Sequence, residues 1–243
     1  MKKLICALGA LLVTAAFAGE WLARDAVTKG VRQAAVTGLG VPADTEIDVD
    51  IPGSLLFQLA TGTIGEATVS SPEVAVDSFT GGISATVRDL QPGAGPAISG
   101  GTVIVTLDAA ELRGLMSTVD GFPADTLGLS APEVTASTVL DVFGAAVPLG
   151  IGFTPRADAG DLVLAPGSLT LGSAQITADE LRRTLGGMAD GVLHDWRVCI
   201  AEDLPAAVTL SGVEVTGDHL VATFDLAGGV LTDAALRQKG ACA

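Results

Sequence analysis

Hydrophobic and acidic residues alternate from residue 46 to residue 51, a pattern typical of a half-buried β-strand. Ile47, Val49 and Ile51 would share one face of this strand, and three acidic residues would share the other. Pro52 and Gly53 then interrupt the pattern, and the sequence predicts a short helix from Ser54 to Ala60 that ends before Gly62. The predicted helix carries four large apolar residues: Leu55, Leu56, Phe57 and Leu59.

Similar alternation predicts further strands in both halves of the chain. The strand-like runs are Ala67–Ser70, Glu73–Phe79, Ile83–Leu90, Val103–Leu107, Ala207–Val215 and Leu220–Ala227. Short connections containing Gly separate several of these runs, so neighbouring strands are expected to pair as antiparallel hairpins.

Three more segments have helical spacing. Residues 20–37 form a modest amphipathic pattern, and capping-box-like starts at Asp108 and Thr177 open the other two helices. The predicted fold is therefore α+β, mostly antiparallel β-structure with three or four short helices.

The first eighteen residues have the pattern of a secretory signal peptide. Lys2 and Lys3 precede an uncharged run from Leu4 to Gly19, which is shorter than the ~20 residues of a membrane-spanning helix. The sequence Ala16-Phe17-Ala18 provides a cleavage site, so we expect a signal over residues 1–18 and a single domain over residues 19–243. The alternative is an uncleaved N-terminal anchor. Both alternatives predict a folded part outside the cytoplasmic membrane, in the periplasm or cell envelope.

Composition and charge limit the classes of binding partner that we expect. The chain has 243 residues, 49% of them hydrophobic, which is enough for a substantial core. The 13 basic and 28 acidic residues give a formal net charge of −15, and no basic cluster is present, so nucleic acid is not an expected partner. Contact with a membrane surface would have to come from apolar burial and not from a polybasic patch.

Two cysteines, Cys199 and Cys242, remain after residue 18, and an even number in an oxidising compartment favours a disulfide between them. We expect no metal site and no cofactor, because the two cysteines and two histidines do not have metal-ligand spacing.

The sequence offers little catalytic chemistry. Of the two histidines, His219 falls in a predicted turn, and His194 is the one candidate general base. The serine-nucleophile, metalloprotease and phosphate-loop motifs are absent, so we expect a protein that is not an enzyme. A hydrolase that uses His194 remains an alternative.

The order of these segments resembles the LmeA-like phospholipid-binding family of actinobacterial envelope proteins. The stretches that carry the resemblance are IPGSLLFQLATGTIGEATVSS with Pro52, Gln58, Leu59 and Gly62, VTLDAAELRGLM, LPAAVTLSGVEVTGDHLVATFDLAG, and the cysteine-bearing tail from Lys239 to Cys242. The resemblance covers essentially the whole chain after the predicted signal. It implies a long curved antiparallel sheet wrapped around short helices, as in tubular lipid-binding domains, and it brings no catalytic residues.

The resemblance also implies a secreted or membrane-tethered protein that binds phospholipid and supports the assembly of envelope lipids or glycolipids, with glycolipid-synthesis enzymes as possible partners. The apolar faces of the predicted helices would then line a lipid cavity, although ordinary core packing is the better explanation for any single one of these residues. The candidate lining residues are Leu55, Leu56, Phe57, Leu59, Leu112, Leu115, Met116, Leu181, Leu185 and Met188. An envelope scaffold protein that carries no lipid is the competing function.

Overall fold

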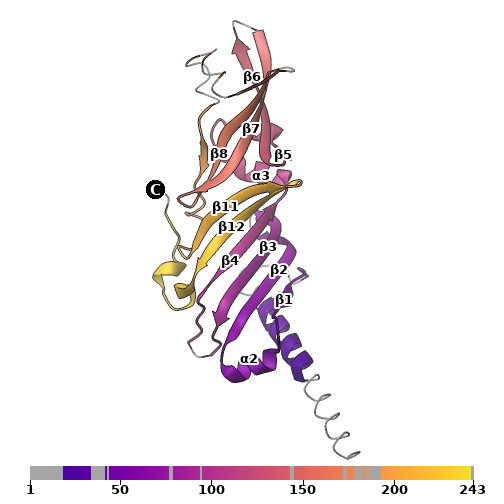
Figure 1. Cartoon of the computed structure of the whole chain (residues 1–243), viewed down its shortest axis with the longest axis vertical. Coiled ribbons are helices and arrows are strands. Elements are labelled where there is room, and N and C mark those ends of the chain that lie inside the picture. The colour runs from indigo at the N-terminus through magenta and orange to yellow at the C-terminus, as the bar shows by residue number, and fades with distance from the viewer. Residues whose placement is uncertain are drawn as a thin grey trace, which may run out of the picture.

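The molecule is elongated and consists mainly of antiparallel β-structure with short helices (Figure 1). The computed structural model describes the chain except for residues 1–18, 34–41, 43, 77–78, 94, 143–144, 172–173, 178–179, 181–182, 184–185, 187–192 and 242–243. The α+β class and the antiparallel sheet are confirmed. The strands form two open sheets that follow one another along the long axis.

The first sheet has six strands in the order β1-β2-β3-β4-β12-β11. Its strands are β1 (Asp48–Asp50), β2 (Ile64–Val76), β3 (Phe79–Leu90), β4 (Gly100–Leu107), β11 (Val208–Thr216) and β12 (His219–Ala227). The C-terminal hairpin β11–β12 joins this sheet beside β4, so residues from both ends of the chain make one surface.

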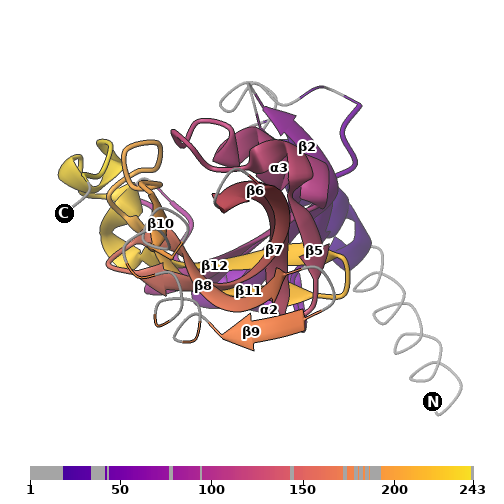
Figure 2. The same ribbon diagram turned by 90° about the horizontal axis from the view of Figure 1, so that it is seen from above.

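The second sheet has the order β10-β8-β7-β6-β5, and β9 pairs separately with β8. Its strands are β5 (Gly128–Ser130), β6 (Glu133–Val142), β7 (Ala145–Asp158), β8 (Asp161–Leu171), β9 (Ala174–Thr177) and β10 (Trp196–Val198). β11 of the first sheet lies beside β7, which joins the two sheets (Figure 2).

The helices are short and lie at the ends of the first sheet. Residues 19–33 form the N-terminal helix, followed by α2 (Leu55–Thr61) and α3 (Ala109–Met116). Single 3-10 turns complete the described elements: η1 (Ala124–Thr126), η3 (Gly228–Leu231) and η4 (Ala235–Arg237). α3 lies near the junction of the two sheets, and α2 lies at the far end of the first sheet.

Local sequence explains where α2 and α3 begin and end. Ser54 caps α2, and Gly62 ends it in a left-handed conformation (φ 82°) that favours glycine. Asp108 and Glu111 form the predicted capping box at the start of α3.

Two groups of buried residues hold the fold together. The large core combines residues of both sheets and of α3, including Leu112, Phe153 and Phe224. The small core lies under the N-terminal helix and α2 and consists of Ile51, Leu55, Ile64 and Ala67.

Candidate functional site

The first sheet has one apolar and one polar face, because apolar and polar residues alternate along its strands. On the apolar side, which we call the inner face, the pairing registers align one residue from each of the six strands: Val49, Val69, Ala85, Val103, Phe224 and Leu210. The adjacent row on the outer face is polar throughout: Asp50, Thr68, Thr86, Thr102, Asp225 and Thr209. The sheet is therefore amphipathic across its whole width.

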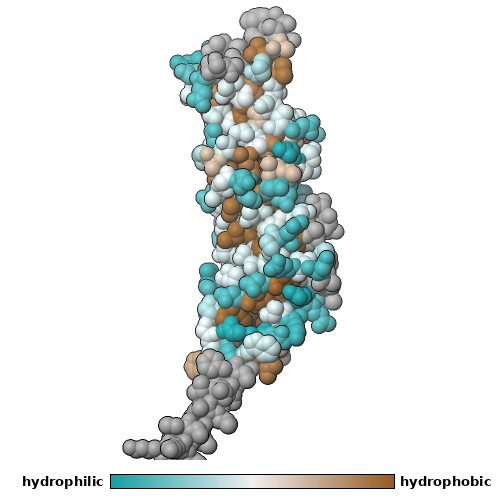
Figure 3. Space-filling model, turned by 90° about the vertical axis from the view of Figure 1, so that its right-hand side faces the viewer, coloured by the Kyte–Doolittle hydropathy of each residue, from teal (hydrophilic) through white to brown (hydrophobic). Residues whose placement is uncertain are grey.

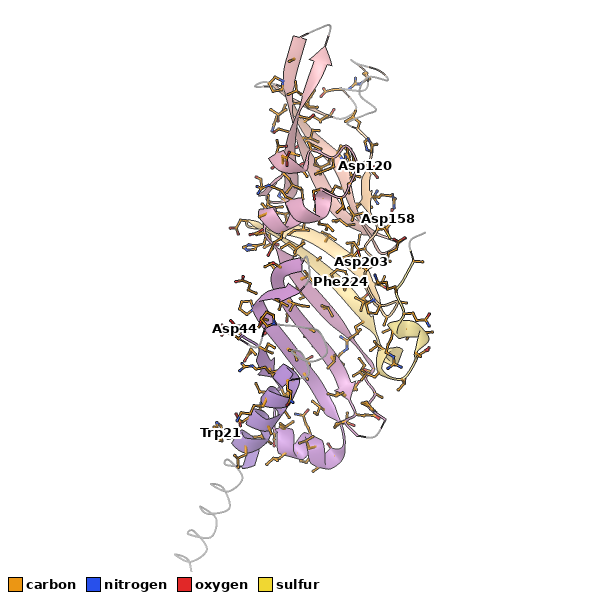
Figure 4. The ribbon with its side chains drawn as sticks, turned by 180° about the vertical axis from the view of Figure 1, so that it is seen from behind. Trp21, Asp44, Asp120, Asp158, Asp203 and Phe224 are labelled. Atoms are coloured by element: carbon orange, nitrogen blue, oxygen red, sulfur yellow. The ribbon has the colours of Figure 1, made fainter. Side chains whose placement is uncertain are left out.

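Protein covers the two ends of the inner face and leaves its middle half-buried. The small core packs on the end near α2, and the large core packs on the end near α3, where Phe224 lies (Figure 4). Between them, the described residues Val69, Ile83 and Ala85 are half-buried and pack against neither core. We call these three residues the inner strip.

Small apolar side chains border the inner strip. Val87 packs against the small core, whereas Val103 and Val105 pack against the large core. A side view of the molecule shows apolar residues in a broken band along the long axis, bordered by hydrophilic residues (Figure 3). A surface of this kind suits an extended apolar ligand, because binding sites for such ligands are largely apolar with few polar groups.

An open hollow of about 750 Å³ lies where the β2–β3 hairpin approaches the start of α3. Its lining includes His219 and three carboxylate residues, Glu73, Asp108 and Glu111, and it also includes Ile83 of the inner strip. Burying an acyl chain against these polar groups would cost their hydration. The inner strip is therefore the better candidate for an apolar ligand.

The structure divides the predicted lining residues into two groups. Leu55 is fully buried in the small core, Leu112 and Met116 are fully buried in the large core, and Leu115 packs against the large core. Leu181, Leu185 and Met188 lie outside the described residues. Contact of any of these residues with lipid stays a prediction.

The other three predicted residues lie on the exposed side of α2. Leu56, Phe57 and Leu59 have 39%, 70% and 41% of their surface exposed, so they face away from the sheet. Trp21 (67%) and Leu22 (59%) are exposed on the N-terminal helix. Trp21 lies at the same end of the molecule as α2 (Figure 4).

Glu20 links the N-terminal helix to the start of α2. Its carboxylate accepts hydrogen bonds from the backbone N–H groups of Leu55 (2.7 Å) and Leu56 (3.1 Å) and from the hydroxyl of Ser54 (3.0 Å). The backbone N–H of Leu55, followed by that of Leu56, holds the pKa of Glu20 below its ordinary 4.5. The carboxylate satisfies N–H groups that the first turn of a helix leaves without partners.

Arg24 strengthens the same link. Its Nε donates to Glu20 over 3.0 Å, and its guanidinium also donates to the carbonyl of Ile51 (2.9 Å) and to that of Gly53. The N-terminal helix and α2 are thus held together by one hydrogen-bonded network.

The candidate base His194 is exposed, and its ring contacts Trp196 with 4.0 Å between ring centroids. The adjacent carboxylate, Asp195, pairs with Arg156 at 2.6 Å. Within the described part of the chain, no group of acidic, histidine or cysteine residues is arranged to hold a metal ion.

Cys199 takes part in a disulfide. Cys242 lies outside the described residues, so the pairing of these two cysteines remains a prediction.

The alternation that predicts the strand from Ile83 to Leu90 is also a signal for the inner strip. Ile83, Ala85 and Val87 alternate with Ser84, Thr86 and Arg88, which predicts a two-faced strand. The alternation alone could not show that the middle of the apolar face lies between two cores, because that depends on packing from distant segments.

Comparison with known proteins gives one match. A family model described as LmeA-like phospholipid-binding matches residues 14–225, which include the first sheet up to Asp225, both cores and the two linked helices. Comparisons with curated proteins and with solved structures gave no match.

Proposed function

The chain belongs to the LmeA-like phospholipid-binding family, and we propose that it carries a phospholipid with an acyl chain lying along the inner strip. The observation that supports this site is the apolar row across all six strands, whose middle is half-buried. Valine and alanine leave more room above the sheet than larger residues would.

The energetics favour exchange of lipid with a membrane. Each buried methylene contributes roughly 0.8 kcal/mol, so a chain of about sixteen carbons gains on the order of 12 kcal/mol before other costs. The chain gains a similar amount in a bilayer. A carrier can therefore exchange the lipid at little net cost only where its surface is comparably apolar, and the inner face is the candidate for such a surface.

The role that we propose is extracytoplasmic phospholipid binding or transfer in support of envelope lipid or glycolipid assembly. The N-terminal sequence pattern supports a location in the periplasm or cell envelope, and the membrane surface would be the donor or acceptor of the lipid. Enzymes of glycolipid synthesis are the partners that such a role implies. In the part of the chain that the structure describes, no helix is both long and apolar enough to cross a membrane.

In this proposal the protein binds phospholipid and does not catalyse a reaction. His194, the candidate base, packs on Trp196, and its neighbour Asp195 is engaged by Arg156. The family is described by what it binds.

Adjacent residues of β3 provide a matched test. Ala85 belongs to the inner strip, whereas Ser84 is on the outer face and lines the polar hollow. We expect Ala85→Asp to lower phospholipid retention by about tenfold or more, because a buried chain would have to pack against a charge. Ser84→Asp should change retention less than about twofold. Native mass spectrometry and solvent extraction of protein purified without detergent would measure the bound lipid.

Thermal unfolding of both variants would confirm that they remain folded. Equal loss of lipid in Ser84→Asp would place the ligand in the hollow instead. A wild-type protein that neither carries phospholipid nor takes it up from vesicles would favour the scaffold function.

A further inference from the structure

Exposed apolar residues gather at one end of the molecule. Among the described residues, eight large apolar side chains are exposed, and five of them belong to the N-terminal helix and α2: Trp21, Leu22, Leu56, Phe57 and Leu59. We call these five residues the apolar tip. Single exposed apolar residues are common on protein surfaces, but a cluster marks an interaction site.

The start of the N-terminal helix contacts the start of α2. Glu20 and Arg24 bond both helices together, as described above. A Cβ atom placed on Gly19 would lie 3.2 Å from Cδ1 of Leu56, so the start of the N-terminal helix touches the apolar side of α2. The exposed apolar side chains of both helices therefore lie at the same end of the molecule.

The charge distribution around the apolar tip favours an apolar partner. The segment from Ile51 to Gly65 contains no charged residue, although the chain carries a net charge of −15. On the N-terminal helix, Glu20 is paired with Arg24, and Asp25 is paired with Lys29 at 2.7 Å. Docking at this end would consequently not bring uncompensated carboxylates from these segments against an anionic or zwitterionic surface.

We propose that the apolar tip docks the protein on the surface of a phospholipid bilayer. Trp is enriched at membrane interfaces, and Leu and Phe beside it would enter the acyl boundary to the shallow depth of about 5–10 Å that interfacial helices reach. The exposed Trp21 and the absence of uncompensated carboxylates in these segments fit a bilayer better than a protein partner.

Docking rests on the proposed function in one respect only, because a docked protein needs a bound lipid to exchange. α2 leads directly into β2, and the small core separates the apolar tip from the inner strip. Docking would hold the α2 end of the inner face against the membrane from which the proposed lipid is taken.

Vesicles of phosphatidylcholine with brominated acyl chains would test the docking. The chain has two tryptophans, and Trp196 is buried in the large core, so bromine quenching reports on Trp21. With detergent-free exported protein, we expect quenching that saturates with lipid. The double variant Leu56→Asp/Phe57→Asp should lower the vesicle partition coefficient by about tenfold or more, because two apolar side chains no longer leave water.

Val139→Asp is the matched control, because Val139 is 63% exposed but lies on β6 of the second sheet, and its partitioning should stay within about twofold of the wild type. The proposal would be overturned if the double variant still bound vesicles, or if Val139→Asp weakened vesicle binding equally. Quenching that is absent in the wild type, or binding of a second copy of the chain at the tip in place of lipid, would also overturn it.

A crossed experiment separates this proposal from the proposed function. Monomeric short-chain phosphatidylcholine needs no bilayer, so the double tip variant should bind it normally while losing vesicle binding. Ala85→Asp should show the reverse. If neither the wild type nor the tip variant binds the monomeric lipid but vesicle docking persists, the lipid-carrier function fails and the docking surface stands.

Discussion

At the scale of single residues, Glu20 sets the position of α2 against the N-terminal helix. Its carboxylate accepts two backbone N–H groups and the Ser54 hydroxyl and pairs with Arg24. Because the folded protein holds the pKa of Glu20 below 4.5, the carboxylate stabilises the fold above pH 4.5. This contribution is lost as the pH falls through the lowered folded-state pKa.

We therefore expect Glu20→Gln to lower the Tm at neutral pH, and the difference from the wild type to disappear in acid. Thermal unfolding followed by circular dichroism, from neutral to acidic pH, would measure both effects. Glu46→Gln, at an exposed position, is the control. A Tm deficit that persists unchanged in acid would show that Glu20 acts through packing and not through its charge.

The residues that carry the family resemblance around α2 have structural roles. The Gln58 amide donates to the carbonyl of Pro52 (2.8 Å) and accepts from the N–H of Gly65 (2.9 Å). Gly62 ends the helix with a positive φ. These residues shape the turn that presents Leu56, Phe57 and Leu59, and the sequence alone did not distinguish this role from lining a cavity.

At the scale of elements, the sequence predicted the helix starts well and the sheet connections poorly. Capping signals are local, so Ser54 and the Asp108–Glu111 box placed α2 and α3 to within a residue. Two predicted runs, Ala67–Ser70 and Glu73–Phe79, are largely one strand, because a register shift between Ser71 and Val74 lets β2 continue through Pro72. The partners of β4 were not predictable from pattern, because β12 comes from the distant C-terminal part.

The α3 capping box can be tested directly. Asp108 Oδ1 accepts from the N–H groups of Ala110 (2.7 Å) and Glu111 (2.8 Å), and Glu111 accepts from the N–H of Asp108 (2.6 Å). We expect Asp108→Ala to lower the free energy of unfolding by about 1 kcal/mol. Urea unfolding would measure the loss, and exposed Asp125→Ala on η1 is a control. An effect no larger than that of the control would mean that packing of Leu112 and Met116 alone positions α3.

At the scale of the whole molecule, the two sheets share one core and leave one apolar face partly open. The ring of Phe153 on β7 packs at a tilt against the ring of Phe122, and Phe122 packs edge-on against Trp196 of β10. The same core continues to Phe224 of β12. The aligned polar row of the first sheet lies on its outer face, and the apolar inner strip lies on its inner face. A protein built this way can stay soluble in water while it offers a dry surface to lipid.

A shared core predicts that the two sheets unfold together. Phe153 is fully buried, so we expect Phe153→Ala to lower the free energy of unfolding by about 3–5 kcal/mol through the cavity that it leaves. Hydrogen exchange should then accelerate in β3 and β12 as well as in β6–β8, because opening the core exposes both sheets. Leu231→Ala, at a residue 40% exposed, should change stability by no more than about 0.5 kcal/mol. Faster exchange confined to β6–β8 would mean that the second sheet opens as a separate unit, in which case residues 19–243 are two domains and not the single one expected.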